Sequence, residues 1–341
     1  MSHPFPDLVQ LFDGLPTPTA DVGLGRFCAL PVPGHPLCAV GKDISGNPVL
    51  LIEADNAQPG TVPPLVLEHL AVIHMVTCRV QNPHLATNDR TLSVIRCTGA
   101  DRALHEYFLR SLHPVVVSLP PKPSRQQISD AIERLVDLFR QMTEAPRKTV
   151  AGLWAELFVI AQAHDPAKLL SSWHAMPEDR FDFALGIDRV DVKSASGGVR
   201  MHHFSLEQLR PAEPSRVVIV SLLIERMEGG TSVNDLVDTI RGKIADPNLL
   251  IRLDSVVAQT LGQDWRAGQQ VRFDLQQAVH SLRFVEASAI PSVSVPVPTE
   301  VSAVHFRVDL TQHPLLFPDV LMQEGELFRA TLPPAGVPGA I

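Results

Sequence analysis

Three carboxylates and one lysine stand out because each is set in an otherwise apolar stretch of the chain. Two of the acids and the lysine lie in RFDFALGIDRVDVKSA, residues 180–195, whose pattern predicts two short strands around a turn. Side chains two residues apart share a strand face, so Asp191 and Lys193 lie on one face and Val190 and Val192 on the other. An acid and an ammonium on one face of such a ribbon favour a chemical role for that face.

The turn sets the register of this predicted hairpin. A two-residue type II′ turn, with glycine first, fits residues 186–187 and pairs Phe183 with Val190. The same register places Asp182 opposite Asp191. Like charges in that position destabilise a sheet unless a positive group lies between them. The alternative is an edge hairpin with a charged face in solvent, and Asp188, at the turn, is expected to be solvated in either case.

The third carboxylate is Glu156, the only ionisable residue between Ala151 and Ala161 in the predicted helix VAGLWAELFVIAQAH. A helix that is apolar on all sides is normally buried, and an unpaired buried carboxylate is costly. A metal ion bound by Glu156, Asp182 and Asp191 would account for all three acids. All-oxygen ligands favour a hard cation, Mg²⁺ or Mn²⁺.

The elements around these residues predict a mixed α/β fold. Residues 1–118 contain apolar runs separated by Pro, Gly and Asn, which is typical of β structure, and the proline-rich segment 120–124 marks a boundary. Beyond it, periodicity predicts helices after Ser124 and Thr149, the hairpin, a short Ser-capped helix at 205–210, a strand, and two more helices. From about residue 270 the period of two returns, which predicts further strands.

Composition narrows the class of protein. The 341 residues are 45% hydrophobic and 19% charged, and the net charge of −8 argues against nucleic-acid binding through a strongly basic surface. The N-terminal segment does not have the pattern of a signal peptide, and no apolar run approaches a membrane span, so a cytoplasmic protein with no membrane partner is expected. The four cysteines have no paired spacing and are expected to be small core residues.

The order of these features along the chain resembles the motif of the PD-(D/E)XK nuclease superfamily: a helical Glu, a strand Asp, a turn and then Asp-Val-Lys. More narrowly, the chain is similar to a bacterial domain-of-unknown-function group assigned to that superfamily, through GLWAEL, the tryptophan of SSWHAMPEDRFDF, VDVKS, FSLEQL and the closing segment from LRFVEA to HFRVDL. That group often has glycine at the position of Ala155 and Gly-Pro at His174-Ala175. These departures leave the acids in place but change the local loop.

The resemblance implies a restriction-endonuclease-like mixed sheet flanked by helices. It divides the chain into a β-rich N-terminal domain (1–119), a nuclease core (124–268) and a C-terminal β-rich extension (269–341). It also implies catalysis by Glu156, Asp182, Asp191 and Lys193, with Mg²⁺ or Mn²⁺ held by the three acids and the Val192 carbonyl. Gln208 is an accessory candidate, and the candidate phosphate contacts are Arg147, Lys148, Arg200, Arg210 and Arg216.

The expected activity is Mg²⁺-dependent hydrolysis of DNA phosphodiester bonds in bacterial restriction or phage defence. RNA as the substrate is left open, as are a homodimer and protein partners from a defence system. The alternative is an inactive subunit that keeps the fold and binds DNA or a partner protein. The acidic net charge and the β-rich flanks are compatible with that second role.

Overall fold

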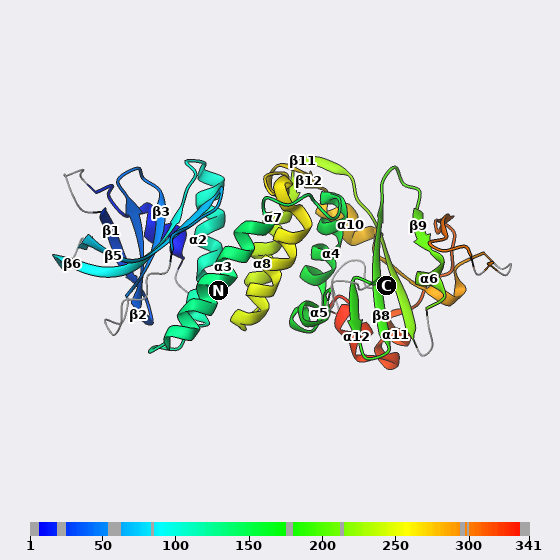
Figure 1. Ribbon diagram of the computed structural model, residues 1–341. Coiled ribbons are helices and arrows are strands. Elements are labelled where there is room, and N and C mark those ends of the chain that lie inside the picture. The colour runs from blue at the N-terminus through cyan, green and yellow to red at the C-terminus, as the bar shows by residue number, and fades with distance from the viewer. Residues whose placement is uncertain are drawn as a thin grey trace. The chain divides into compact units, whose positions relative to one another are not determined.

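The computed structural model describes residues 7–18, 25–53, 63–82, 85–174, 180–211, 215–293, 297–298 and 300–334 (Figure 1). The chain forms two compact units, Met1–Ala145 with Ala245–Gln263, and Pro146–Ile244 with Asp264–Ile341. This division differs from the predicted boundaries in two respects, the first being that the predicted C-terminal extension, 269–341, belongs to the same unit as the hairpin. The helices at 125–141 and 247–261, which were expected in the nuclease core, belong to the unit that contains the N-terminal strands.

The first unit contains a six-stranded sheet of order β1-β2-β3-β6-β5-β4. Its first strand also pairs in parallel with β5, so the sheet closes on itself and few strand edges stay exposed. Its interior holds apolar side chains from four strands, among them Phe27, Leu51 and Val94. The strands are β1 (Gly25–Val32), β2 (His35–Asp43), β3 (Pro48–Glu53), β4 (Leu65–Val66), β5 (Leu70–Asn82) and β6 (Leu85–Cys97).

Four helices complete this unit: α1 (Leu8–Asp13), α2 (Arg102–Val117), α3 (Arg125–Gln141) and α8 (Pro247–Leu261). The α3 helix begins after Ser124, as predicted, with a capping box in which Ser124 and Gln127 bond each other's backbone. The α2 helix continues through Pro114, although proline has no backbone N–H to donate to the helix. Cys28, Cys38, Cys78 and Cys97 are free and buried, as predicted.

The second unit is built on a four-stranded sheet of order β13-β10-β8-β7, which mixes parallel and antiparallel pairs. Strand β7 is Phe183–Leu185, β8 is Asp188–Ala195, β10 is Arg216–Leu223 and β13 is Arg283–Glu286. The predicted hairpin register is confirmed, because Phe183 pairs with Val190 across a two-residue turn. Gly186 in that turn has φ +56°, a conformation that glycine adopts without strain.

One face of this sheet is covered by α4 (Val150–Gln162), α5 (Pro166–Ser172) and α12 (Glu326–Thr331), of which α4 and α12 pack on β8. The prediction that α4 is buried on all sides is confirmed, since every residue from Leu153 to Ala161 is buried. The α7 helix (Val233–Arg241) packs in turn on α4. Figure 1 shows β8 between α4 and β9, and β8 is one of the two inner strands of the sheet.

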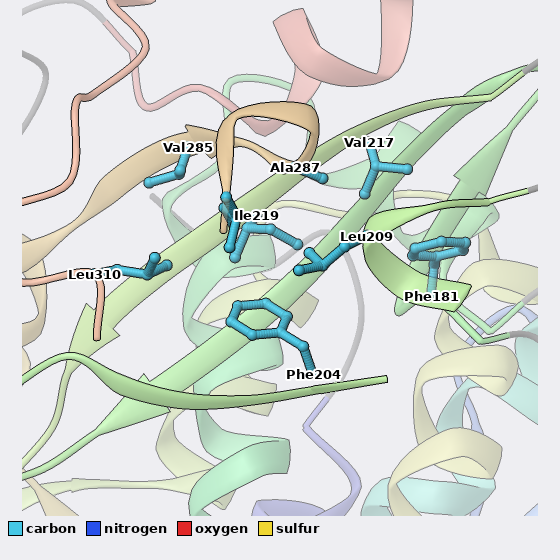
Figure 2. Packing of buried hydrophobic residues seen from close by; sticks show 9 residues of the cluster. Phe181, Phe204, Leu209, Val217, Ile219, Val285, Ala287 and Leu310 are labelled. Atoms are coloured by element: carbon cyan, nitrogen blue, oxygen red, sulfur yellow. The ribbon is translucent and has the colours of Figure 1, made fainter. Parts of the chain in front are cut away.

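The other face carries β9 (Met201–Ser205) paired with β14 (His305–Asp309), and α6 (Leu206–Leu209), which begins at a Ser205 capping box. Figure 2 shows the core beneath them, where Phe204, Leu209 and Leu310 meet Ile219 of β10 and Val285 of β13. Burial of each such side chain contributes about 1.5–3 kcal/mol. This core holds β9 and α6 against the sheet, next to the end of the hairpin that bears the acids.

The segment after residue 269 is not the β-rich extension that the sequence suggested. Its strands pair with strands from earlier in the sequence. Strand β13 extends the four-stranded sheet, β14 pairs with β9, and β12 (Arg272–Phe273) pairs with β11 (Arg226–Ser232). Between and after them lie α10 (Leu275–Ser281), α11 (Pro318–Glu324) and α12, with α9 (Ala267–Gln270) just before. In the described part of the chain, no helix combines the length and the hydrophobicity that a membrane span requires.

Candidate functional site

The predicted acids line one pocket of about 390 Å³ in the second unit. The pocket lies where the N-terminal end of α4 meets the start of β7 and the middle of β8, and α6 borders it. Each predicted catalytic residue, Gln208 and the backbone of β8 contribute to it. Its lining is Lys148, Thr149, Gly152, Glu156, His174, Arg180, Asp182, Asp191, Val192, Lys193 and Gln208.

Glu156 and Asp182 converge on the ammonium group of Lys148. The Nζ atom of Lys148 lies 2.6 Å from Oε1 of Glu156 and 2.7 Å from Oδ1 of Asp182. Both acids are buried, while 36% of the Lys148 side chain is exposed. Burial alone would lower the pKa of Lys148, but the two carboxylates raise it above the usual range.

Two aromatic residues after α5 complete this group. The indole Nε1 of Trp173 donates a 2.8 Å hydrogen bond to Oε2 of Glu156, and Nε2 of His174 lies 3.0 Å from the same oxygen. Trp173 is fully buried and forms a bridge with Phe183 at the start of β7. Its position explains why one oxygen of Glu156 turns toward this segment and the other toward Lys148.

Asp182 connects this group to β8. Its Oδ2 atom accepts a 2.7 Å hydrogen bond from the backbone N–H of Val192. In a strand the N–H and C=O of one residue point to the same side, so the Val192 carbonyl faces the Asp182 side as well. Burial would raise the pKa of Asp182, but the charges of Lys148 and His174 and these hydrogen bonds lower it below its usual value. Asp182 is therefore ionised.

Asp191 and Lys193 form the second half of the site. The Nζ atom of Lys193 lies 2.7 Å from Oδ2 of Asp191, close enough for an ion pair but out of line for a hydrogen bond. Gln208 donates a 3.2 Å hydrogen bond to Oδ1 of Asp191, and its own Oε1 lies 3.5 Å from Lys193. Burial raises the pKa of Asp191 to about 7, against the opposing effect of Lys193.

The predicted phosphate contacts are dispersed. Arg200 is buried, and its guanidinium donates to Ser221 and Ser281 within the fold, so its assignment as a phosphate contact is wrong. Arg147 and Arg210 are exposed but do not line the pocket. Arg216 pairs with Asp188. Lys148 is at the site, but it bonds to acids.

Asp188 corrects another expectation. This turn residue is buried, and its Oδ1 atom accepts hydrogen bonds of 2.9 Å and 2.5 Å from Arg216. Asp188 therefore lies against Arg216 of β10 and Gly325 before α12, while residues 186–187 of the turn are exposed. Asp188 does not line the pocket, so its charge serves the packing of the hairpin.

Sequence reasoning named Lys148 only as a phosphate contact, not as the partner of the acids, and it missed the imidazole of His174 and the exposed rim residue Arg180. Lys148 had a detectable signal, since it directly precedes the N-cap of a helix whose single charge is a glutamate. His174 had none, because only the tertiary structure brings it to Glu156, 18 residues earlier in the chain. Ala175, the second residue of the pair that departs from the family pattern, lies outside the described residues.

Comparison with known proteins gives one finding. A model of the DUF4420 family, described as "Putative PD-(D/E)XK family member", matches residues 10–311. No curated protein matches the chain, and no solved structure does. The match covers most of the chain, including the helix that bears Glu156 and the Asp-Val-Lys strand, so the chain belongs to the DUF4420 family.

Proposed function

We propose that this protein is a metal-dependent nuclease that hydrolyses DNA phosphodiester bonds in the cytoplasm, in bacterial restriction or phage defence. The observation that carries the proposal is the convergence of Glu156, Asp182, Asp191 and Lys193 on one pocket in a chain of the PD-(D/E)XK family. A restriction-endonuclease-like arrangement of the central sheet is part of the same proposal. DNA, a defence-system protein and a second copy of the chain are the proposed partners.

The residues present fit a divalent cation. Carboxylate oxygens from α4 and from the start of β7 already enclose a positive charge, the ammonium of Lys148, which stands where such an ion would be held. Glu156, Asp182 and Asp191 with the Val192 carbonyl would hold it, and Mg²⁺ or Mn²⁺ suits that oxygen-rich set. When bound, the ion would polarise a phosphate and lower the pKa of an attacking water.

The protein's own groups would orient the reaction around that ion. The ammonium of Lys193 lies 5.6 Å from the Phe204 ring centroid, and its side chain is 19% exposed, so bulk water only partly screens its charge. It would stabilise negative charge that develops on the phosphate. Gln208 keeps Asp191 and Lys193 in place through its two contacts. Arg180, at the exposed rim of the pocket, would contact a neighbouring phosphate.

A nuclease assay tests the proposal. Purified protein is incubated with supercoiled DNA, linear DNA and single-stranded RNA, in Mg²⁺, Mn²⁺ or EDTA. Asp191→Ala and Lys193→Ala should remove cleavage, while the surface controls Asp319→Ala and Lys122→Ala should keep it. Cleavage that survives both site substitutions would reject the site. RNA cleavage without DNA cleavage would change the substrate.

A second function has a specific observation in its favour. The ion pairs of Lys148 partly neutralise the acids without a metal, as expected for an inactive subunit that retains the fold to bind DNA or a partner protein. The net charge of −8 agrees with a place in a larger assembly. Folded protein that cleaves no nucleic acid in any metal, and whose melting temperature is unchanged by Mg²⁺ and Mn²⁺, would establish this role instead.

A further inference from the structure

The tip of Lys148 lies among three atoms of the kind that bind metals. Its Nζ atom is 2.6 Å from Oε1 of Glu156, 2.7 Å from Oδ1 of Asp182 and 3.2 Å from Nε2 of His174. Each of the three residues offers a ligand atom, and these atoms lie within 4.8 Å of one another. A single small cation can therefore contact all three, and in this structure that cation is an ammonium.

The third of these atoms changes the chemistry of the site. Two carboxylates alone suit Mg²⁺, whereas imidazole nitrogen is a preferred ligand of first-row transition metals and a poor one for Mg²⁺. The imidazole of His174 turns toward the acids, and 22% of its side chain is exposed. Its Nε2 atom is 3.9 Å from Oδ1 of Asp182, in addition to its closer contact with Glu156.

The backbone holds His174 in this position against its own preference. Its φ is +42°, in the left-handed region that non-glycine residues rarely occupy and that costs on the order of 1–3 kcal/mol. The backbone N–H of His174 donates a 2.9 Å hydrogen bond to the carbonyl of Asp182, so the strained residue is tied to one of the acids. Trp173, bonded to Glu156, fixes the other side.

We propose that His174 is a ligand of the ion that Glu156 and Asp182 hold, that the site therefore selects a first-row transition-metal ion over Mg²⁺, and that Lys148 is the resident cation which the ion displaces. The inference rests on the proposed function only in that the ion is the cofactor of the same site. An ammonium keeps its acceptors about 2.6–3 Å away, whereas transition metals bind nitrogen and oxygen at about 2.0–2.2 Å. The two cations therefore cannot share the site, and Lys148 must leave it.

Displacement also gives Lys148 a second position. Its side chain is already partly exposed at the pocket, beside Thr149 and Gly152 of the α4 N-terminus. Once released, the ammonium remains at the rim of the pocket and faces whatever anion enters. The same lysine thus closes the metal site before the ion binds and adds a positive charge to the pocket afterwards.

Metal binding, measured without any substrate, tests this inference. Co²⁺ is titrated into the full-length protein while its visible absorption is recorded, since nitrogen ligation changes the intensity and position of the bands. Mg²⁺ competition then gives the ratio of the two affinities. His174→Gly retains the left-handed backbone and removes the ligand, and His203→Asn, on an exposed residue of β9, is the matched control.

The expected result is that His174→Gly weakens Co²⁺ binding by about 10–100-fold and changes Mg²⁺ binding by less than about threefold. Added imidazole should restore the Co²⁺ spectrum of His174→Gly. Lys148→Gln should bind Co²⁺ about tenfold more tightly, because no resident cation competes. Circular dichroism of each variant confirms that it is folded.

If His174→Gly kept the wild-type ratio of Co²⁺ to Mg²⁺ affinity and the wild-type Co²⁺ spectrum, the assignment of His174 as a ligand would be wrong. If folded Lys148→Gln bound Co²⁺ no more tightly than wild type, the displacement of Lys148 would be wrong. These outcomes are separable from the proposed nuclease activity. Co²⁺ binding through His174 in a protein that cleaves nothing would leave the inference intact and reject the proposed function. Mg²⁺-dependent cleavage, together with Co²⁺ binding that is unchanged in His174→Gly, would support the proposed function and reject the inference about His174.

Discussion

The second unit contains two buried polar clusters that differ in what balances their charge. The acid cluster consists of Glu156, Asp182 and Asp191 with Lys148 and Lys193, and it lines the pocket. The serine cluster consists of Arg200, His202, Ser221 and Ser281, where Arg200 donates to the Ser221 carbonyl and hydroxyl at 2.9 Å and 2.8 Å and to the Ser281 carbonyl. Three acids face two lysines in the first cluster. In the serine cluster, the cation Arg200 is hydrogen-bonded only to neutral serine oxygens among the contacts described above.

The electrostatic consequences follow the same division. In the serine cluster, burial lowers the pKa of Arg200 to about 10 and that of His202 to about 4, so His202 is neutral at pH 7. In the acid cluster, Asp182 remains ionised although it is buried. A buried charge alone therefore does not mark a site. The acid cluster differs from the serine cluster in that it lines an open pocket and contains more acids than lysines.

The largest effect is expected from Asp191→Asn, which should act in opposite directions on activity and stability. Cleavage should fall by about 100-fold or more, since a ligand carboxylate is lost. In EDTA at pH 8 the free energy of unfolding should rise by about 1–3 kcal/mol. The folded pKa of about 7 exceeds the unfolded value of 3.8, so the cost of ionising Asp191 grows from pH 4 to 7 and is complete above. Urea unfolding of wild type and Asp191→Asn at pH 5 and 8 measures this effect. If Asp191→Asn were less stable than wild type at pH 8, that result would contradict the assignment.

The next effect is the acid sensitivity of the serine cluster. The pKa of His202 is lowered from 6.5 to about 4, so the unfolded chain binds a proton more readily than the folded one. Stability should be complete above about pH 6.5 and fall by up to about 3 kcal/mol as the pH drops toward 4. Urea unfolding from pH 4.5 to 8 should show a weaker fall in His202→Gln, with the exposed His280→Gln as control. Equal slopes for His202→Gln and wild type would contradict the assignment.

Arg200→Met should cost about 2 kcal/mol of unfolding free energy, because the Ser221 and Ser281 carbonyls lose their buried donor. Metal binding should change by less than about twofold, since Arg200 does not line the pocket. Chemical denaturation and metal titration measure the two quantities. A loss of nucleic-acid affinity with unchanged stability would restore Arg200 as a phosphate contact and erase the distinction between the clusters.

The smallest effect concerns the turn that positions the acids. Gly186→Ala should lower the free energy of unfolding by about 1–2 kcal/mol, because φ is +56° and the space for a Cβ is open, so only backbone strain contributes. Gly14→Ala, where φ is −71°, is the control without this strain. Thermal unfolding measures both variants. An equal change in their free energies of unfolding would show that residue 186 does not require a positive φ.

The sequence predicted the hairpin register, the burial of Glu156, and the helix starts after Ser124, Thr149 and Ser205, because local periodicity, capping and turn chemistry determine them. It also placed all four candidate catalytic residues and Gln208 at one pocket. It did not predict which cations would balance the acids. Lys148 lies at the pocket and Arg200 is buried through tertiary packing that no local pattern encodes. The compact units join helices far apart in the chain, α2 and α3 with α8, which is equally invisible to local analysis.

The metal-binding proposal is that Glu156 of α4 and Asp182, which directly precedes β7, hold a divalent ion. A crystal structure of protein soaked in Mn²⁺, with anomalous scattering recorded, tests it most directly. The account predicts an anomalous peak bonded to the Glu156 and Asp182 oxygens, with Lys148 turned away from both. A map with no peak there at saturating Mn²⁺, and with Lys148 still between the two carboxylates, would contradict it.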